Sequence, residues 1–195
     1  MIVASKSLST SLLALLLLLP ALESTGQPAK KASRQEAAGA SRAIATSDFP
    51  DRIAGMSRIG VTSFKQSELG FSVRYVGPDK ATWADVYVYD KGLDLVSADR
   101  AAHLKAEIVS SVGDVKTMVE RGLYRNVSLS PLSRQGQFAT VGIESDVNEK
   151  RTASLLALTV HRDKFVKLRL STPAGPSSSS IQTSFLEALS RQFGI

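Results

Sequence analysis

The segment from Phe138 to Ser171 reads FATVGIESDVNEKRTASLLALTVHRDKFVKLRLS and contains three apolar runs separated by two short polar breaks. This pattern is typical of three antiparallel β-strands joined by tight turns. Strict alternation predicts that nine apolar side chains share one face and form the floor of the core. They are Ala139, Val141, Ile143, Leu156, Leu158, Val160, Val166, Leu168 and Leu170. The middle strand is apolar on both faces, so we expect it in the centre of its sheet.

Alternation also predicts the pairing register, because a slip of one residue turns a whole apolar set to the opposite face. For Val160 to lie opposite Val166, the second turn needs an odd number of residues, most simply residues 162–164. The first turn needs an even number of residues, which places Ile143 opposite Leu156.

The N-terminus has the order of features that is typical of a secretory signal. Lys6 precedes an apolar run over residues 12–19, which is followed by Pro20 and small residues. The run is shorter than the roughly 20 apolar residues that span a bilayer. We therefore expect a signal peptide at residues 1–26, with cleavage between 24 and 29. The mature protein would be periplasmic or secreted, with no transmembrane segment.

Residues 27–47 are rich in Ala, Ser, Lys and Arg without an apolar stripe, which predicts a flexible leader. Residues 48–195 are then long enough for a single α+β domain. The absence of cysteine excludes disulfides and thiolate chemistry. A net charge of +6 is compatible with anionic envelope polymers, although the charges are scattered as in many proteins without such partners. We do not expect nucleic acid as a partner of an exported protein.

Periodicity predicts the elements of this domain. Alternating residues indicate strands over 57–64, 70–77, 82–90 and 126–132, the first of them an edge strand that pairs only in part. In the hairpin of 70–77 and 82–90, Val73 should lie opposite Val86 and Arg74 opposite Asp85, with Trp83 beside the charged pair. Apolar residues at helical spacing predict a long helix over 98–121 and a terminal helix with Ile181, Phe185, Leu189 and Phe193 in one stripe.

These elements make an α+β domain with a mainly antiparallel sheet, a long middle helix and a C-terminal helix. Their order, the GFSVRY strand with its Trp-containing partner, and the segments FPDRIAGMSRIGV, VYVYD and KFVKLRL resemble small exported bacterial proteins of unassigned function with a PsbP/Mog1-like fold. The resemblance implies an α/β/α sandwich and an exported location, and it carries over no catalytic residue.

Catalytic and metal-binding patterns are not recognisable in the sequence. The only imidazoles, His103 and His161, lie on different predicted elements and lack metal-ligand spacing. We therefore assign no catalytic residue, no metal ligand and no cofactor. The alternative of a hydrolase or transferase would have to use His161 with a carboxylate.

Two polar faces are candidate binding surfaces. The first combines Trp83, Asp85, Tyr87 and Tyr89 with Ser72 and Arg74, and can stack on sugar rings or a partner's side chains unless the terminal helix covers it. The second is the far face of the 138–171 meander, which we expect either to bind or simply to be solvated. Its members are Gly142, Glu144, Ala157, Thr159, His161, Lys167 and Arg169.

The sequence therefore predicts a non-enzymatic exported module that binds an envelope protein or an anionic polymer, the latter through Lys167 and Arg169. A subunit of a larger envelope assembly is a further interpretation, and the oligomeric state stays open.

Overall fold

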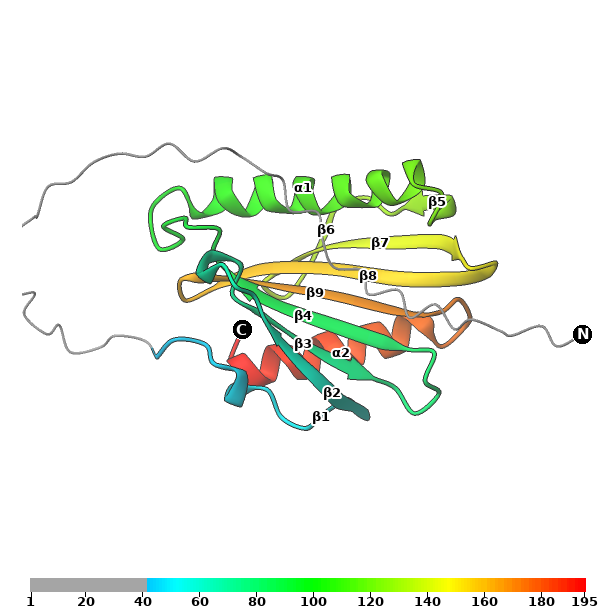
Figure 1. The fold of residues 1–195 in the computed structure, drawn as a ribbon, viewed down its shortest axis with the longest axis horizontal. Coiled ribbons are helices and arrows are strands. Elements are labelled where there is room, and N and C mark those ends of the chain that lie inside the picture. Colours follow the sequence, from blue (N-terminus) through cyan, green and yellow to red (C-terminus); the bar gives the residue numbers. More distant parts are fainter. Residues whose placement is uncertain (1–41) are drawn as a thin grey trace, which may run out of the picture. The chain divides into compact units, whose positions relative to one another are not determined.

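The computed structural model describes residues 42–195, which form a nine-stranded sheet between two helices (Figure 1). The strands are β1 Arg52–Ile53, β2 Met56–Ser63, β3 Phe71–Val76, β4 Trp83–Tyr89, β5 Arg125–Leu129, β6 Ser133–Gln135, β7 Phe138–Val147, β8 Lys150–His161 and β9 Lys164–Pro173. The helices are α1 Arg100–Glu120 and α2 Ser178–Phe193, and two short 3-10 helices are η1 Thr46–Asp48 and η2 Ser67–Leu69.

The sheet runs in the order β1-β2-β3-β4-β9-β8-β7-β5, with β6 also paired to β7, and every pair is antiparallel. Helix α1 lies on one face and α2 on the other (Figure 1). The predicted fold class, a mainly antiparallel sheet with a long middle helix and a C-terminal helix, is confirmed. Strand β8 lies between β7 and β9, as its two apolar faces predicted.

The β3–β4 hairpin has the predicted register. Val73 lies opposite Val86 and Arg74 opposite Asp85. Both valines are fully buried on the α2 side of the sheet, whereas Arg74 and Asp85 point to the α1 side, because neighbouring residues alternate between faces.

The turn between β8 and β9 differs from the prediction. His161 pairs with Lys164, so the turn contains two residues, and the first of them, Arg162, has a left-handed φ of 57°. Val160 consequently lies opposite Phe165 rather than Val166. The predicted register of this pair was wrong by one residue, which reverses the faces of β9.

The turn between β7 and β8 also differs, but by two residues. Val141, rather than Ile143, lies opposite Leu156, and the turn residues Asn148 and Glu149 both have left-handed φ values. A shift of two residues preserves the faces of a strand. The faces predicted for β7 and β8 therefore stay correct relative to each other.

The predicted nine-residue floor is thus divided between two cores. Val166, Leu168 and Leu170 pack on the α2 side of the sheet. The other six residues of the predicted floor, those on β7 and β8, point to the α1 side. Because each face carries a helix, both sets are needed for packing. The α1-side core contains Tyr89, Leu95, Ile108, Val115, Val141, Ile143, Leu156, Leu158, Val160 and Phe165. The α2-side core includes Val73, Tyr75, Val86, Val88, Phe138, Ala157, Val166, Leu168, Leu170, Phe185, Leu186 and Leu189.

Helix α1 is close to its predicted bounds and ends before Gly122, which has a left-handed φ of 70°. Gly113 is exposed, and a Cβ there would meet open space. No contact among the described residues therefore requires a glycine at this position. The inner face of α1 carries two buried polar residues, Glu107 and Ser111, beside the apolar Ile108 and Val115.

The expected signal peptide at residues 1–26 lies outside the described residues, as does most of the leader expected at 27–47. Of that leader, residues 42–47 are described, and Ile44 is buried in the α2-side core. Asp48 accepts a hydrogen bond from the Ala45 amide at 2.9 Å. The packed residues of the described range therefore include Ile44, which precedes the expected boundary at Asp48. In the described range, neither helix is long and apolar enough to cross a membrane.

Candidate functional site

The structure brings six of the eight predicted site residues to one face. Asp85 lies opposite Arg169, and Tyr87 lies opposite Lys167, in the β4–β9 pair. The two predicted surfaces thereby merge, because the reversed faces of β9 carry its cations to the α1 side. The six residues are Arg74, Trp83, Asp85, Tyr87, Lys167 and Arg169. The terminal helix α2 lies on the opposite face, so the expectation that it covers Trp83 was wrong.

Lys167 lies beneath α1 rather than on a solvated face. Its Nζ is 5.4 Å from the centre of the Tyr87 ring and 5.2 Å from that of Tyr89. It also lies 3.4 Å from Ser111 Oγ and 4.0 Å from Glu107 Oε1. Burial lowers the pKa of Lys167, and the Glu107 carboxylate opposes this shift. The ammonium group of Lys167 therefore makes its contacts inside the protein, where it links β9 to α1.

Glu107 is the acceptor at the centre of the same cluster. Tyr89 donates its hydroxyl hydrogen to Glu107 Oε1 at 2.6 Å, and Lys91 forms an ion pair with Oε2. Burial raises the pKa of the Tyr89 phenol, as does the neighbouring Glu107 carboxylate. A neutral phenol donating to a carboxylate, with two cations nearby, satisfies the buried charge of Glu107.

The other charges of this face include an ion pair between the exposed Arg74 and the buried Asp85. Arg74 donates from Nε and Nη2 to the two carboxylate oxygens of Asp85 at 2.6 and 2.8 Å. The hydrogen bond with Asp85 raises the pKa of Arg74. Arg169 donates to the Tyr124 hydroxyl at 2.5 Å, and its guanidinium carbon is 5.4 Å from the centre of that ring. Among the described residues Arg169 makes no ion pair.

Thr159 and His161 lie on the α2 side, apart from the other six residues. Thr159 is buried, and the Nε2 atom of His161 is buried with no hydrogen-bond partner among residues 42–195. Burial and the charges of Arg162 and Arg100 lower the pKa of His161. No described carboxylate hydrogen-bonds this imidazole, so its surroundings do not favour general acid-base chemistry. The described residues also contain no cluster of three or more His, Cys, Asp or Glu side chains that could hold a metal ion.

The outer edge of β2 is a surface that sequence reasoning did not select. Strand β1 pairs only with Met56 and Ser57, and no other described strand covers the rest of β2. The Phe64 amide donates to the Gly70 carbonyl at 3.0 Å. By antiparallel alternation, Val61 and Ser63 therefore direct their N–H and C=O groups away from β3. The only signal in the sequence was the edge strand predicted at 57–64.

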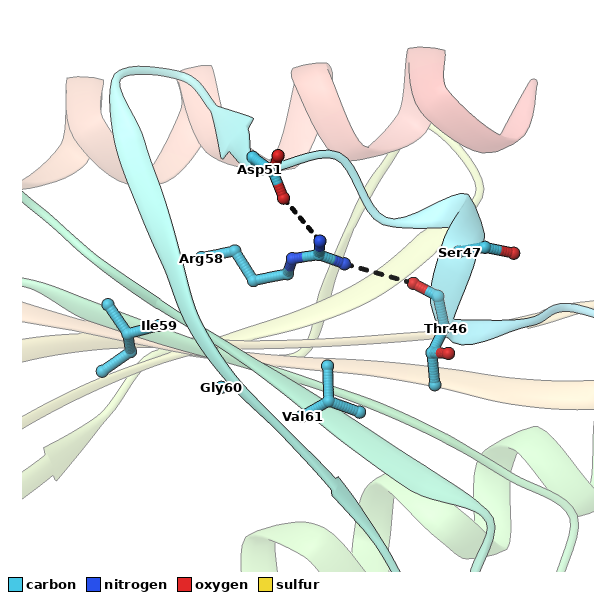
Figure 2. Close-up of a pocket in the computed structure, with 7 residues that line it drawn as sticks. All are labelled: Thr46, Ser47, Asp51, Arg58, Ile59, Gly60 and Val61. Carbon is cyan, nitrogen blue, oxygen red and sulfur yellow. Dashed lines mark hydrogen bonds and ion pairs between the residues drawn. The ribbon is translucent and has the colours of Figure 1, made fainter.

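A hollow of about 440 Å³ accompanies this edge (Figure 2). It is lined by Thr46, Ser47, Asp51, Arg58, Ile59, Gly60 and Val61. Arg58 spans it, donating to the Phe49 carbonyl at 2.9 Å and to Asp51 Oδ1 at 2.5 Å. Figure 2 shows Ile59 and Val61 reaching out on opposite sides of the strand, as expected from the bulge between Arg58 and Gly60. Their exposed fractions are 62% and 43%.

Comparisons with known proteins give a weak structural likeness and no sequence match. No protein-family model matches the sequence, and a search of curated proteins finds no match. The solution structure of cyanobacterial PsbP (CyanoP) from Synechocystis sp. PCC 6803 resembles this structure with a TM-score of 0.39 and 15% sequence identity. The match covers 75% of this chain and 86% of that chain. The PsbP-like resemblance predicted from the sequence is therefore present, in weak form.

Proposed function

We propose that this protein is an exported, non-enzymatic interaction module that binds an extended segment of an envelope protein. The segment would add to the sheet as a strand on the outer edge of β2. The signal pattern of Lys6 and residues 12–19 supports the exported location. The observation that carries the proposal is the uncovered backbone of Val61 and Ser63 beside a hollow.

The side chains of this edge favour recognition over simple exposure. Proteins normally protect edge strands with charged residues, proline or a covering element. Residues 59–63 read IGVTS and contain no charged residue and no proline, and two of them, Ile59 and Val61, are exposed apolar residues against which a partner can pack. Gly60 lets a partner backbone approach closely because it has no side chain. Strand addition uses such edges, with affinity from backbone hydrogen bonds and specificity from adjacent pockets.

The size of the edge favours a peptide segment over a second folded copy. The uncovered part of β2 is only five residues long, about 17 Å. Stable association of two folded proteins buries about 800 Å² on each partner, which is a broader surface than this short strand edge. A single extended segment would contact both walls of the hollow, which are the β2 edge and η1. Pairing of two flat sheet edges would leave the hollow unfilled.

Site-specific photocrosslinking in the cell of origin tests the proposal. A photoreactive residue replacing Thr62 should crosslink to a segment of an envelope protein, and mass spectrometry should identify an extended, alternating apolar sequence. Val61→Pro removes an outward N–H that β3 does not use, a position where an edge strand tolerates proline. This variant should keep the wild-type thermal midpoint and lose the crosslink.

A photoreactive residue at Val109 is the control, because that residue is also exposed but lies on α1. The same crosslinked protein at Val109 would contradict strand addition. Crosslinks that persist in Val61→Pro, or that join two copies of this chain, would also overturn the proposal.

A further inference from the structure

A second hollow, of about 320 Å³, lies where three segments distant in sequence meet. The β3–β4 turn, the β7–β8 turn and the last residue of β9 enclose it. Its volume is at the lower end of the range of about 300–1,000 Å³ for small-ligand sites. It is lined by Lys80, Ala81, Trp83, Val147, Asn148, Lys150, Arg151, Thr152 and Pro173, none of which lines the hollow at β2.

The lining combines an apolar floor with positive charge. Trp83, half-buried at the start of β4, provides the largest apolar surface, next to Val147 and Pro173. Every charged residue of the lining is a cation, and no Asp or Glu belongs to it. A mostly apolar hollow with a few charged groups is the usual composition of a site for a small ligand.

Two of the three cations are free to meet a ligand. Arg151 pairs with Glu144 at 2.8 Å and with Asp146 at 3.4 Å, so nearby carboxylates offset its charge. Lys80 and Lys150 are exposed, and within residues 42–195 neither forms an ion pair. The hollow therefore presents two uncompensated ammonium groups beside an indole ring.

The β3–β4 turn, which carries Lys80, is held in place. The Asp79 carboxylate accepts hydrogen bonds from the Ala81 amide at 3.1 Å, the Thr82 amide at 2.9 Å and the Thr82 hydroxyl at 2.7 Å. The hydroxyls of Thr82 and Thr172 lie 3.1 Å apart, which joins the turn to β9. A site whose frame is ordered before binding loses less conformational entropy when the ligand arrives.

We propose that this hollow binds a phosphorylated sugar ring, either as a free monosaccharide phosphate or as a residue of an anionic envelope polymer. The indole of Trp83 offers an apolar face against which the ring would pack. A phosphate monoester carries a charge of about −1.5 to −2 at neutral pH, which matches the two lysines. The site is separate from β2, so its ligand is independent of the proposed protein partner.

Trp83 is the only tryptophan of the chain, so intrinsic fluorescence reports directly from the hollow. Titration of the full chain with glucose 6-phosphate should give a saturable fluorescence change that weakens between 0.1 M and 1 M salt, because the Debye length falls from about 10 Å to about 3 Å. Glucose and inorganic phosphate should each bind at least about tenfold more weakly, equivalent to about 1.4 kcal/mol.

A phosphomannan compared at equal phosphate concentration distinguishes the two sources of the ligand. Tighter binding of the polymer would assign the site to polymer residues, and tighter binding of the monosaccharide would assign it to a free metabolite.

The double variant Lys80→Gln with Lys150→Gln should raise the Kd for glucose 6-phosphate about tenfold, equivalent to about 1.4 kcal/mol. Lys105→Gln with Lys116→Gln removes the same charge from exposed positions of α1 and should leave the Kd unchanged. No saturable change, equal binding of inorganic phosphate, or equal losses in the two double variants would each overturn the proposal.

Discussion

Lys167 on β9 lies directly opposite Leu158 on β8, and both side chains point toward α1. An apolar side chain and a cation thus share the covered face of the sheet. Leu158 is fully buried in the α1-side core, while Lys167 lies between tyrosine rings and the inner face of α1. Lys167 is therefore less accessible to the anionic polymer predicted to bind through Lys167 and Arg169 than the exposed Lys80 and Lys150 are.

Leu158→Ala should lower the free energy of unfolding by about 2–5 kcal/mol, as truncations of buried leucines do. Leu158 has no exposed surface, so the truncation leaves a cavity beneath α1. Urea denaturation monitored by circular dichroism would measure the change. Val109→Ala, at an exposed position of α1, should change stability by about 0.5 kcal/mol or less. Equal midpoints for the two variants would contradict this packing.

Lys167→Ala should lower the free energy of unfolding by about 1–3 kcal/mol, because it removes a buried polar partner and the packing of the aliphatic stem against Tyr87 and Tyr89. A solvated position, the alternative considered for this face from the sequence, would change stability by no more than about 0.5 kcal/mol. Urea midpoints provide the measurement, with the exposed Lys105→Ala as the control. The same small effect in both variants would place Lys167 at the surface.

Acidification should destabilise the protein through His161. Its folded-state pKa is lowered from 6.5 by burial and by Arg162 and Arg100, so the unfolded chain takes up the proton more readily. The free energy of unfolding therefore falls as pH decreases through 6.5 toward the folded-state pKa, and this loss is absent at higher pH.

His161→Gln should lose less stability than wild type between pH 7.5 and pH 5.5 in urea titrations. His103→Gln, on α1, leaves the buried imidazole in place and should keep the wild-type response. If all three proteins lose the same stability on acidification, His161 is not the group responsible.

Two glycine-to-alanine substitutions should have opposite effects. Gly70 has a φ of +58°, and a Cβ there would lie 1.9 Å from the Val88 carbonyl oxygen. Gly70→Ala should therefore cost about 3 kcal/mol or more, from backbone strain and displaced packing. Gly113→Ala should stabilise α1 by about 0.8–1 kcal/mol, because its Cβ would meet open space and alanine favours the helix. Thermal midpoints that shift in the same direction would contradict this difference.

The candidate surfaces could be predicted only in part. Trp83 and its neighbours on β3 and β4 were found because one hairpin carries them and its register follows from local alternation. The hollow around Trp83 also requires Lys150, which begins β8 and is 67 residues further along the chain. The hollow at β2 likewise requires Thr46 and Ser47 beside Gly60. Tertiary packing creates such neighbours, and no local period in the sequence marks them.

The sequence by itself determined seven of the nine described strands, the two helices and the β3–β4 register, since each depends on periodicity within a short segment. Strands β1 and β6 are too short to show such a period. Only the tertiary structure decided which way β9 faces. In β9, Val166, Leu168 and Leu170 alternate with Lys167 and Arg169, and either set could lie beside the apolar residues on one face of β8, because β8 is apolar on both faces. The turn after His161 has two residues, an even number, and this decides which set faces which side. The helices on both faces then bury both sets of side chains, so the cations lie beneath α1 and the apolar residues pack on α2.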